Sequence, residues 1–227
     1  MAGVFCTDKC YGVVPEIENS IVEGYMMRTY TIKKIQGAPA WDTIPVMPID
    51  TVCWDKGADI SAQAQICWDE NALYLKLQAR EAEIRMEEKG ETAMPCLDSC
   101  LEFFFRPTDA LDYINVEFNP NAALWLGYGS ADIYLIRLLV PHLDRDFKPE
   151  VTFTDDGWSI TYQIPFFFIR RFFPEFAPVE GYRMWANAYK CGDKTSTPHY
   201  FSWNPMSSAT PDFHRPQDFG CLVFGGE

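Results

Sequence analysis

The sequence predicts an all-β protein: an antiparallel β-sandwich of immunoglobulin-like or jelly-roll-like type, with at most one or two short helices. Three observations lead to this class. Many short runs alternate apolar and polar residues with period two, turn residues separate the runs, and helical periodicity is almost absent. Short strands that follow one another through tight turns are typical of sandwiches, in which each of two sheets buries one face.

The clearest predicted strand lies at residues 73–80, where Leu73, Leu75 and Leu77 alternate with more polar side chains. Residues 113–118 and 158–164 show the same alternation, and further strands are expected near 182–190 and 198–203. Because successive side chains of a strand point to opposite faces, each run places one apolar face toward a core.

Turn residues separate these strands at 69–71, 119–121, 155–157 and 191–193. Residues 166–173 are the segment that favours a helix, because Pro165 suits a first helical turn and Pro174 would end the helix. One short helix does not change the predicted class.

The length of 227 residues, without repeats or a linker-like segment, favours a single domain over 1–227, with 1–40 as an N-terminal extension or the first strands. The formal net charge of −13 would repel nucleic-acid phosphates and anionic membranes, so neither is an expected partner. Residues 1–10 lack the pattern of a signal peptide. We therefore expect a cytoplasmic protein with reduced cysteines, or a secreted one if a leader has been removed.

Candidate binding residues follow from strand parity. On residues 98–105, Glu102 shares one face with Asp98, Cys100 and Phe104. Two other faces mix aromatic and planar polar side chains, namely Tyr113, Asn115 and Glu117, and Trp185, Asn187 and Tyr189. Such groups suit a sugar, whose hydroxyls bond to carboxylates and amides and whose apolar face stacks on rings. The alternative is that the glutamates pair with Lys or Arg across strands and the rings simply pack.

Five segments, in this order, resemble the family 9 carbohydrate-binding modules: WDENALYLKLQARE (68–81), DSCLEFFFRP (98–107), YINVEFNP (113–120), DDGWSITYQIPF (155–166) and PDFHRPQDFGCLVF (211–224). The resemblance covers residues 41–224 and is strongest to stand-alone family-9-like proteins, whose C-terminal half reads like NAYKCGDKTSTPHYFSWNP (187–205). It implies a β-sandwich that holds a sugar between two aromatic rings. The implied function is non-catalytic carbohydrate binding in polysaccharide catabolism, as in the modules attached to xylanases.

The resemblance also implies a set of site residues. One family ring precedes an Asp-Ser-x-Glu stretch, where residues 94–96 here carry no ring, and the other matches Phe213. Glu102 matches the family glutamate, Asn115 stands where an arginine is expected, and the loop at Trp125 could replace the missing ring. For the basic candidates the alternative role is anchoring loops. The expected ligand-binding residues are Glu102, Asn115, Glu117, Trp125, Asn187, Tyr189, Lys190, Phe213, His214 and Arg215.

No cofactor is expected to be required. Family modules also bind calcium, which takes oxygen ligands, although aspartates at turns more often cap the backbone. The calcium candidates are Asp69, Asp98, Asp155, Asp156 and Asp193. Two cysteine pairs, Cys6–Cys10 and Cys96–Cys100, lack the spacing of a compact zinc site.

Two functions compete with carbohydrate binding. A glycoside hydrolase would use Glu102 and Glu117 on neighbouring strands, because glycosidases use two carboxylates ~5 to 10 Å apart. The resembling modules accompany hydrolases without being hydrolases, so catalysis is not expected. A haem-binding relative would need axial ligands, and the three histidines show no recognisable pairing. The expected partner is a mono- or oligosaccharide, with a separately encoded glycoside hydrolase as a further candidate.

Overall fold

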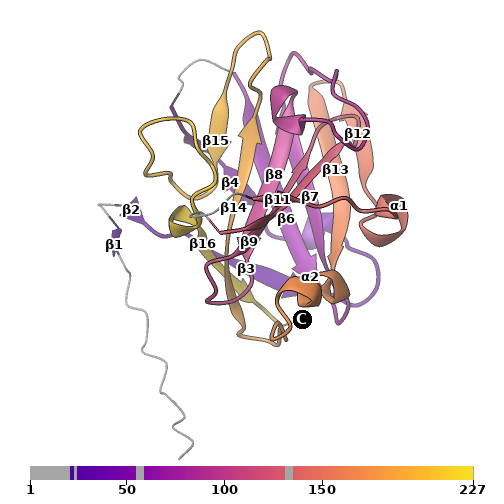
Figure 1. The fold of residues 1–227 in the computed structure, drawn as a ribbon, viewed down its shortest axis with the longest axis vertical. Helices are drawn as coiled ribbons and strands as arrows, with labels where there is room; N and C mark the ends of the chain where they lie inside the picture. The colour runs from indigo at the N-terminus through magenta and orange to yellow at the C-terminus, as the bar shows by residue number, and fades with distance from the viewer. Residues whose placement is uncertain (1–20, 23–24, 55–58, 131–134, 227) are drawn as a thin grey trace, which may run out of the picture.

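The structure is a computed structural model that describes residues 21–22, 25–54, 59–130 and 135–226. Within these residues the chain forms 16 strands, two α-helices and three short 3-10 helices. Fourteen strands belong to one continuous sheet that curls into two layers around a common core (Figure 1). The predicted all-β class is confirmed.

The first layer has the strand order β11-β10-β9-β8-β14-β16, and each neighbouring pair in it is antiparallel. Two short strands extend the layer beside the second half of β14, where β15 pairs with β14 and β5 pairs with β15. The bounds are β5 Thr51–Val52, β8 Cys100–Arg106, β9 Tyr113–Phe118, β10 Leu124–Gly129, β11 Ile136–Arg137, β14 Arg183–Cys191, β15 Tyr200–Ser202 and β16 Gly220–Phe224.

The second layer has the order β6-β7-β13-β12, again antiparallel, with β4 beside β6. Tight turns join β6 to β7 and β12 to β13, as the turn residues at 69–71 and 155–157 predicted. The bounds are β4 Met47–Ile49, β6 Ser61–Trp68, β7 Ala72–Arg80, β12 Glu150–Thr154 and β13 Gly157–Pro165.

Strand β3 (Thr29–Lys34) joins the two layers and corrects the prediction of a purely antiparallel sandwich. Its first part, residues 29–32, pairs in parallel with β16 of the first layer. Its last two residues, Lys33 and Lys34, pair in parallel with β6 of the second layer. Parallel neighbours need a long connection between them, and β16 lies near the far end of the chain, so no local turn signal could reveal this pairing.

The main core lies between the two layers. The leucines of β7 meet Phe103 and Phe105 of β8 and Ile160 of β13 in one buried cluster. These residues have the parity that the alternation predicted, and they are 0% exposed. Burial of such side chains stabilises the fold by roughly 1.5 to 3 kcal/mol each.

The predicted helix forms as α2 (Phe166–Phe172), which begins directly after Pro165 and buries Phe166 and Ile169. Within the described residues, no helix has the length and apolarity that a membrane span requires. The other short elements are α1 Leu143–Asp146, η1 Trp41–Thr43, η2 Pro95–Leu97, η3 Pro216–Asp218 and a small hairpin of β1 Ile21–Val22 and β2 Tyr25–Met26.

A second apolar cluster lies on the outer face of the first layer. It contains Phe104, Tyr113 and Tyr189, whose parity is opposite to that of the core residues on the same strands, together with Phe213 and Phe219 from the C-terminal loop. The first layer is therefore buried on both faces over part of its area. The loop that covers its outer face also borders the pocket described next.

Candidate functional site

A pocket of about 310 Å³ opens on the outer face of the first layer. Its floor comes from strands β8, β9, β10 and β14, and its walls come from loops that are distant in sequence. The lining residues are Trp54, Met94, Cys96, Glu102, Glu117, Trp125, Leu135, Cys191, Asp193, Tyr200, Pro211, Asp212, Phe213 and His214.

A single cross-strand row forms much of the floor. Trp125 of β10 lies opposite Glu117 of β9, Glu117 lies opposite Glu102 of β8, and Glu102 lies opposite Tyr189 of β14. Directly opposed residues of antiparallel strands have Cβ atoms about 4.5 to 5.5 Å apart. The register therefore places two carboxyl groups side by side between two aromatic rings.

The two glutamates are almost fully buried, with 2% exposure for Glu102 and 5% for Glu117. The Asn115 amide donates a hydrogen bond of 2.8 Å to Glu117 Oε1, and the Cys191 thiol lies 2.9 Å from Glu102 Oε1. Burial raises the pKa of Glu102 to about 7. Burial and the neighbouring charge of Glu102 raise the pKa of Glu117 well above its ordinary value. The pair therefore carries fewer than two negative charges at neutral pH.

Aromatic rings form one wall of the pocket. The Phe213 ring stacks on Tyr189 with centroids 4.1 Å apart and lies 5.4 Å from the Trp54 ring. Trp54 in turn meets Tyr200 edge-on at 5.6 Å, and its Nε1 donates to the Ser208 carbonyl at 2.7 Å. Phe213 is 9% exposed, so its neighbours cover most of the ring that the sequence assigned to ligand stacking.

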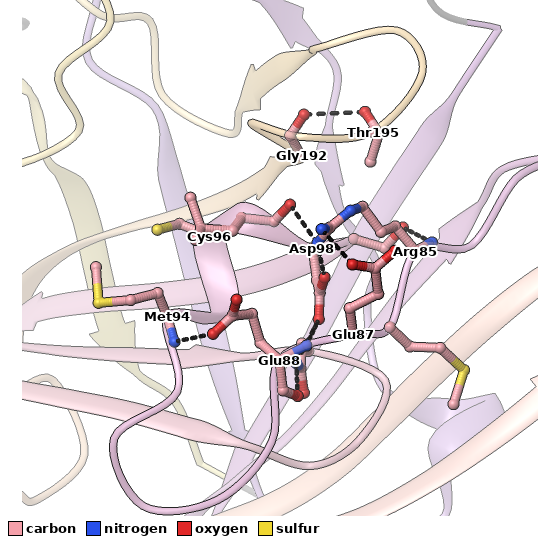
Figure 2. A network of polar contacts seen from close by, with 12 residues as sticks. Arg85, Glu87, Glu88, Met94, Cys96, Asp98, Gly192 and Thr195 are labelled. Atoms are coloured by element: carbon pink, nitrogen blue, oxygen red, sulfur yellow. Dashed lines mark hydrogen bonds and ion pairs between the residues drawn. The ribbon is translucent and has the colours of Figure 1, made fainter.

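A second wall of the pocket is the segment that contains Met94 and Cys96, and buried Asp98 holds it in place (Figure 2). The Asp98 carboxylate accepts hydrogen bonds from Arg85, the Glu88 amide at 2.8 Å and Asn119 at 2.8 Å. The Cys96 carbonyl also accepts the amide of Asp193 at 2.9 Å, which ties this wall to the loop after β14. These contacts fix the wall from both sides.

Trp125 and His214, both predicted from the sequence, also line the pocket. The Arg137 guanidinium lies 4.2 Å from the centroid of the Trp125 ring. His214 Nδ1 shares a hydrogen bond of 2.8 Å with the Tyr113 hydroxyl. The structure therefore brings Glu102, Glu117, Trp125, Phe213 and His214 together at one pocket, with Asn115 and Tyr189 directly beside them.

Asn187 and Arg215 do not line the pocket, and both fasten the C-terminal loop. The Asn187 side chain donates to the Asn204 carbonyl at 2.9 Å and accepts the Asn204 amide at 2.8 Å. Arg215 contacts the Asp218 carboxylate at 3.1 Å and Ser207 Oγ at 3.1 Å. Arg215 therefore anchors a loop, which was the alternative to ligand binding for the basic candidates.

Lys190 also lies away from the pocket, on the opposite face of β14. It is 0% exposed, and its ammonium donates to Glu81 at 3.1 Å, to His199 Nε2 at 2.8 Å and to the Cys191 carbonyl at 2.9 Å. Glu81 also accepts hydrogen bonds from Trp158 Nε1 and Ser99 Oγ. Because β14 alternates its faces, the parity that aims Tyr189 at the pocket aims Lys190 into the protein.

The five aspartates proposed for calcium do not gather at one place, and of the five only the adjacent Asp155 and Asp156 share a turn. Asp98 uses its carboxylate in the network of Figure 2, and Asp69 accepts the amides of Asn71 and Ala72 and the Tyr74 hydroxyl. Asp156 pairs with Arg80, Asp155 is exposed at the same turn, and Asp193 borders the pocket. Calcium binding stays a prediction.

Of the eight cysteines, Cys6 and Cys10 lie outside the described residues. The other six carry free thiols. Within the described part of the chain, one group of at least three metal-ligating side chains gathers closely, and it consists of Cys100, Glu102 and Cys191 at the pocket floor.

Comparison with known proteins identifies the family. The model of the family described as carbohydrate-binding family 9 matches residues 38–224. The chain belongs to carbohydrate-binding family 9. No curated protein matches the chain closely enough to add to this assignment.

Solved structures of family 9 and related proteins share the fold. A candidate carbohydrate-binding protein from Bacteroides uniformis ATCC 8492 is 25% identical, with a TM-score of 0.77 over 87% of this chain and 99% of that one. Two structures of a family 9 module from Caldicellulosiruptor kristjanssonii are 13% identical. The complex with cellotriose has a TM-score of 0.61 over 88% of this chain and 95% of that one. The complex with glucose has a TM-score of 0.63 over 88% and 97%.

Several pocket residues escaped the sequence analysis of this family 9 chain, among them Trp54, Cys191 and Tyr200. Trp54 lies in a loop that precedes β8 by more than 40 residues, yet it packs beside Phe213 in the pocket wall. For Trp54, the signal in the sequence was a tryptophan followed by Asp, Lys and Gly, a composition that favours turns. Residues 94–96, which lack the family ring, do border the pocket, through Met94 and Cys96.

Proposed function

We propose that the pocket binds a mono- or oligosaccharide, without hydrolysing it, between the aromatic wall and the paired glutamates. The observation that carries the proposal is the row in which Glu102 and Glu117 lie side by side at the floor of a pocket walled by Trp54 and Phe213. Family membership supports the same class of ligand.

The protonation of the glutamate pair suits sugar hydroxyls. A hydroxyl donates one hydrogen bond and accepts others, so it is best met by one group that accepts and one that donates. An ionised carboxylate only accepts, whereas a protonated carboxyl also donates. Because burial raises the pKa of both Glu102 and Glu117, the pair offers both kinds of group near neutral pH.

The aromatic wall supplies the stacking surface. Within this wall Trp54 is partly exposed whereas Phe213 is buried, so Trp54 offers a sugar more ring surface than Phe213 does. The partly exposed Trp125 lies at the other end of the floor row. On this proposal Trp54 takes the place of the family ring that residues 94–96 lack. The pocket volume of about 310 Å³ is at the lower end of the range of ~300 to 1,000 Å³ that ligand pockets span, which favours a monosaccharide or the end of an oligosaccharide.

Titration calorimetry with glucose, cellotriose and a panel of other mono- and oligosaccharides tests the proposal. We expect measurable heat for at least one sugar, and an affinity roughly two- to tenfold weaker in Trp54→Ala, since an aromatic contact contributes ~0.5 to 1.5 kcal/mol. Trp41→Ala is the matched control, because Trp41 lies outside this pocket. The absence of heat for the whole panel at millimolar sugar, or an equal loss in both variants, would contradict the proposal.

A further inference from the structure

Two thiols and a carboxyl group meet at the floor of the pocket. Cys100 of β8 and Cys191 of β14 are directly opposed in the antiparallel register, and Glu102 follows Cys100 on the same face. One Sγ atom from each cysteine and one carboxylate oxygen of Glu102 all lie within 4.8 Å of one another. An ion about 2.0 to 2.3 Å from each atom therefore needs only small side-chain rotations.

The charges around this group favour a cation. Glu117 lies beside Glu102 in the next strand, and Asp193 stands at the pocket rim and adds a further negative charge. The positive charge that acts on Glu102 comes from Lys190, whose ammonium points to the other face of β14 and is bound to Glu81. Arg137, over the Trp125 ring, is a further positive charge, and it acts on Glu117. The three side chains that would hold the ion are themselves neutral or negative.

We propose that Cys100, Cys191 and Glu102 form a binding site for one thiophilic divalent cation, with zinc as the ion that fits best. Two thiolates and one carboxylate match the ligand preferences of zinc, whereas calcium and magnesium prefer all-oxygen sites. The proposal rests on the protein's own side chains and does not depend on sugar binding.

The site is accessible from solvent and is incomplete. Glu102 and Cys191 line the pocket, so an ion can enter through it, while Cys100 lies behind them at 0% exposure. Three protein ligands leave the fourth tetrahedral position directed at the pocket, the arrangement of zinc sites that bind an exogenous ligand. That position would take a water molecule or an oxygen atom of a ligand in the pocket.

Binding the ion must release protons. Burial raises the pKa of Cys100 well above its ordinary value, and the hydrogen bond with Cys100 together with burial does the same for Cys191, so both thiols are protonated in the free protein at neutral pH. Each thiol loses its proton to solvent when it ligates the metal, and Glu102 loses the proton that it carries in part. Metal affinity should therefore rise with pH.

Cobalt(II), a spectroscopic probe for tetrahedral zinc sites, tests the proposal with the full-length reduced protein. We expect sulfur-to-cobalt charge-transfer absorption that saturates at one equivalent and disappears when zinc is added. Cys100→Ser and Cys191→Ser should each weaken cobalt binding more than about 100-fold, beyond the 10- to 100-fold typical of an outer-shell partner. Cys221→Ser, in β16, is the matched control and should bind as the wild-type protein does.

X-ray absorption at the zinc edge on wild-type protein avoids variants that fail to fold. We expect two sulfur neighbours at about 2.3 Å and lighter oxygen neighbours at about 2.0 to 2.2 Å. A zinc shell without sulfur, no charge-transfer absorption with cobalt, or absorption that persists in the Cys100→Ser/Cys191→Ser double variant would overturn the proposal. These metal-binding experiments use no sugar. Failure to bind metal would therefore not contradict the sugar proposal, and failure to bind sugar would not contradict the metal proposal.

Discussion

Replacement of Lys190 by methionine tests whether this residue stabilises the fold or binds ligand. Lys190 is 0% exposed and uses its ammonium on three acceptors: Glu81, His199 and the Cys191 carbonyl. Lys190→Met keeps the approximate shape of the side chain but removes the charge and all three donors. The Glu81 carboxylate, 3% exposed, then stays buried without its counter-charge.

The expected loss is about 3 to 5 kcal/mol of unfolding free energy, the usual effect of breaking a buried ion pair from one side. For a chain of this size, 1 kcal/mol shifts the melting temperature by roughly 2 to 4 °C, so the melting temperature should fall by roughly 6 to 20 °C. Adding Glu81→Gln should restore part of the loss, because the second change removes the unpaired charge. Sugar affinity, measured where the variant is folded, should change little, because Lys190 does not line the pocket and its charge is the smallest of the causes that act on Glu102.

Urea denaturation of the single variants, the double variant and Lys194→Met measures these differences. Lys194 is the matched control, because it is exposed in the loop after β14 and should lose less than about 0.5 kcal/mol. A Lys190→Met protein within 1 kcal/mol of wild type would refute the ion-pair argument. A stable Lys190→Met protein with sharply weaker sugar binding would return Lys190 to the ligand site.

Three further predictions concern the pocket and its surroundings. Phe213→Ala should cost about 3 to 5 kcal/mol of unfolding free energy, since the ring is 9% exposed and stacks on Tyr189, and a calorimetric melt that matches wild type would contradict its burial. Chromogenic glycosides should not be turned over, and turnover abolished by both Glu102→Gln and Glu117→Gln would instead support a hydrolase. Burial and Lys190 lower the pKa of His199 to about 4 from its ordinary 6.5, so the unfolded chain binds the extra proton between these values and stability falls as pH drops from 6.5 to 4. Paired urea titrations of the wild-type protein and His199→Gln, both with a chelator present, measure this effect. Between pH 6.5 and 4 the wild-type protein should lose on the order of 2 kcal/mol more unfolding free energy than the variant. A difference between the two proteins that does not change with pH would contradict a buried neutral His199.

The separate strands were predictable because each carries its own periodic signal. The alternation of Leu73, Leu75 and Leu77 gave β7 and its buried face, and two prolines delimited the helix α2. Strand parity also placed Glu102 and Glu117 on pocket-facing sides of β8 and β9. The same parity puts Lys190, which alternates with Tyr189 on β14, on the face away from the pocket.

The residues that cover the pocket-facing sides of β8 and β9 come from distant segments of the chain. Parity says which side chains share a face, but it does not say what covers that face, because the cover comes from another part of the chain. Trp54 therefore joined Phe213 only in the folded structure.

The sequence by itself determined the local elements, because hydrophobic alternation, turn residues and prolines act over a few neighbouring positions. The tertiary structure alone decided the parallel pairing of β3 with β16 and β6, the burial of Lys190 against Glu81, and the meeting of Cys100 with Cys191. Each of these joins segments tens to nearly two hundred residues apart. Such pairings depend on how the whole chain buries its surface, and no local pattern encodes that outcome.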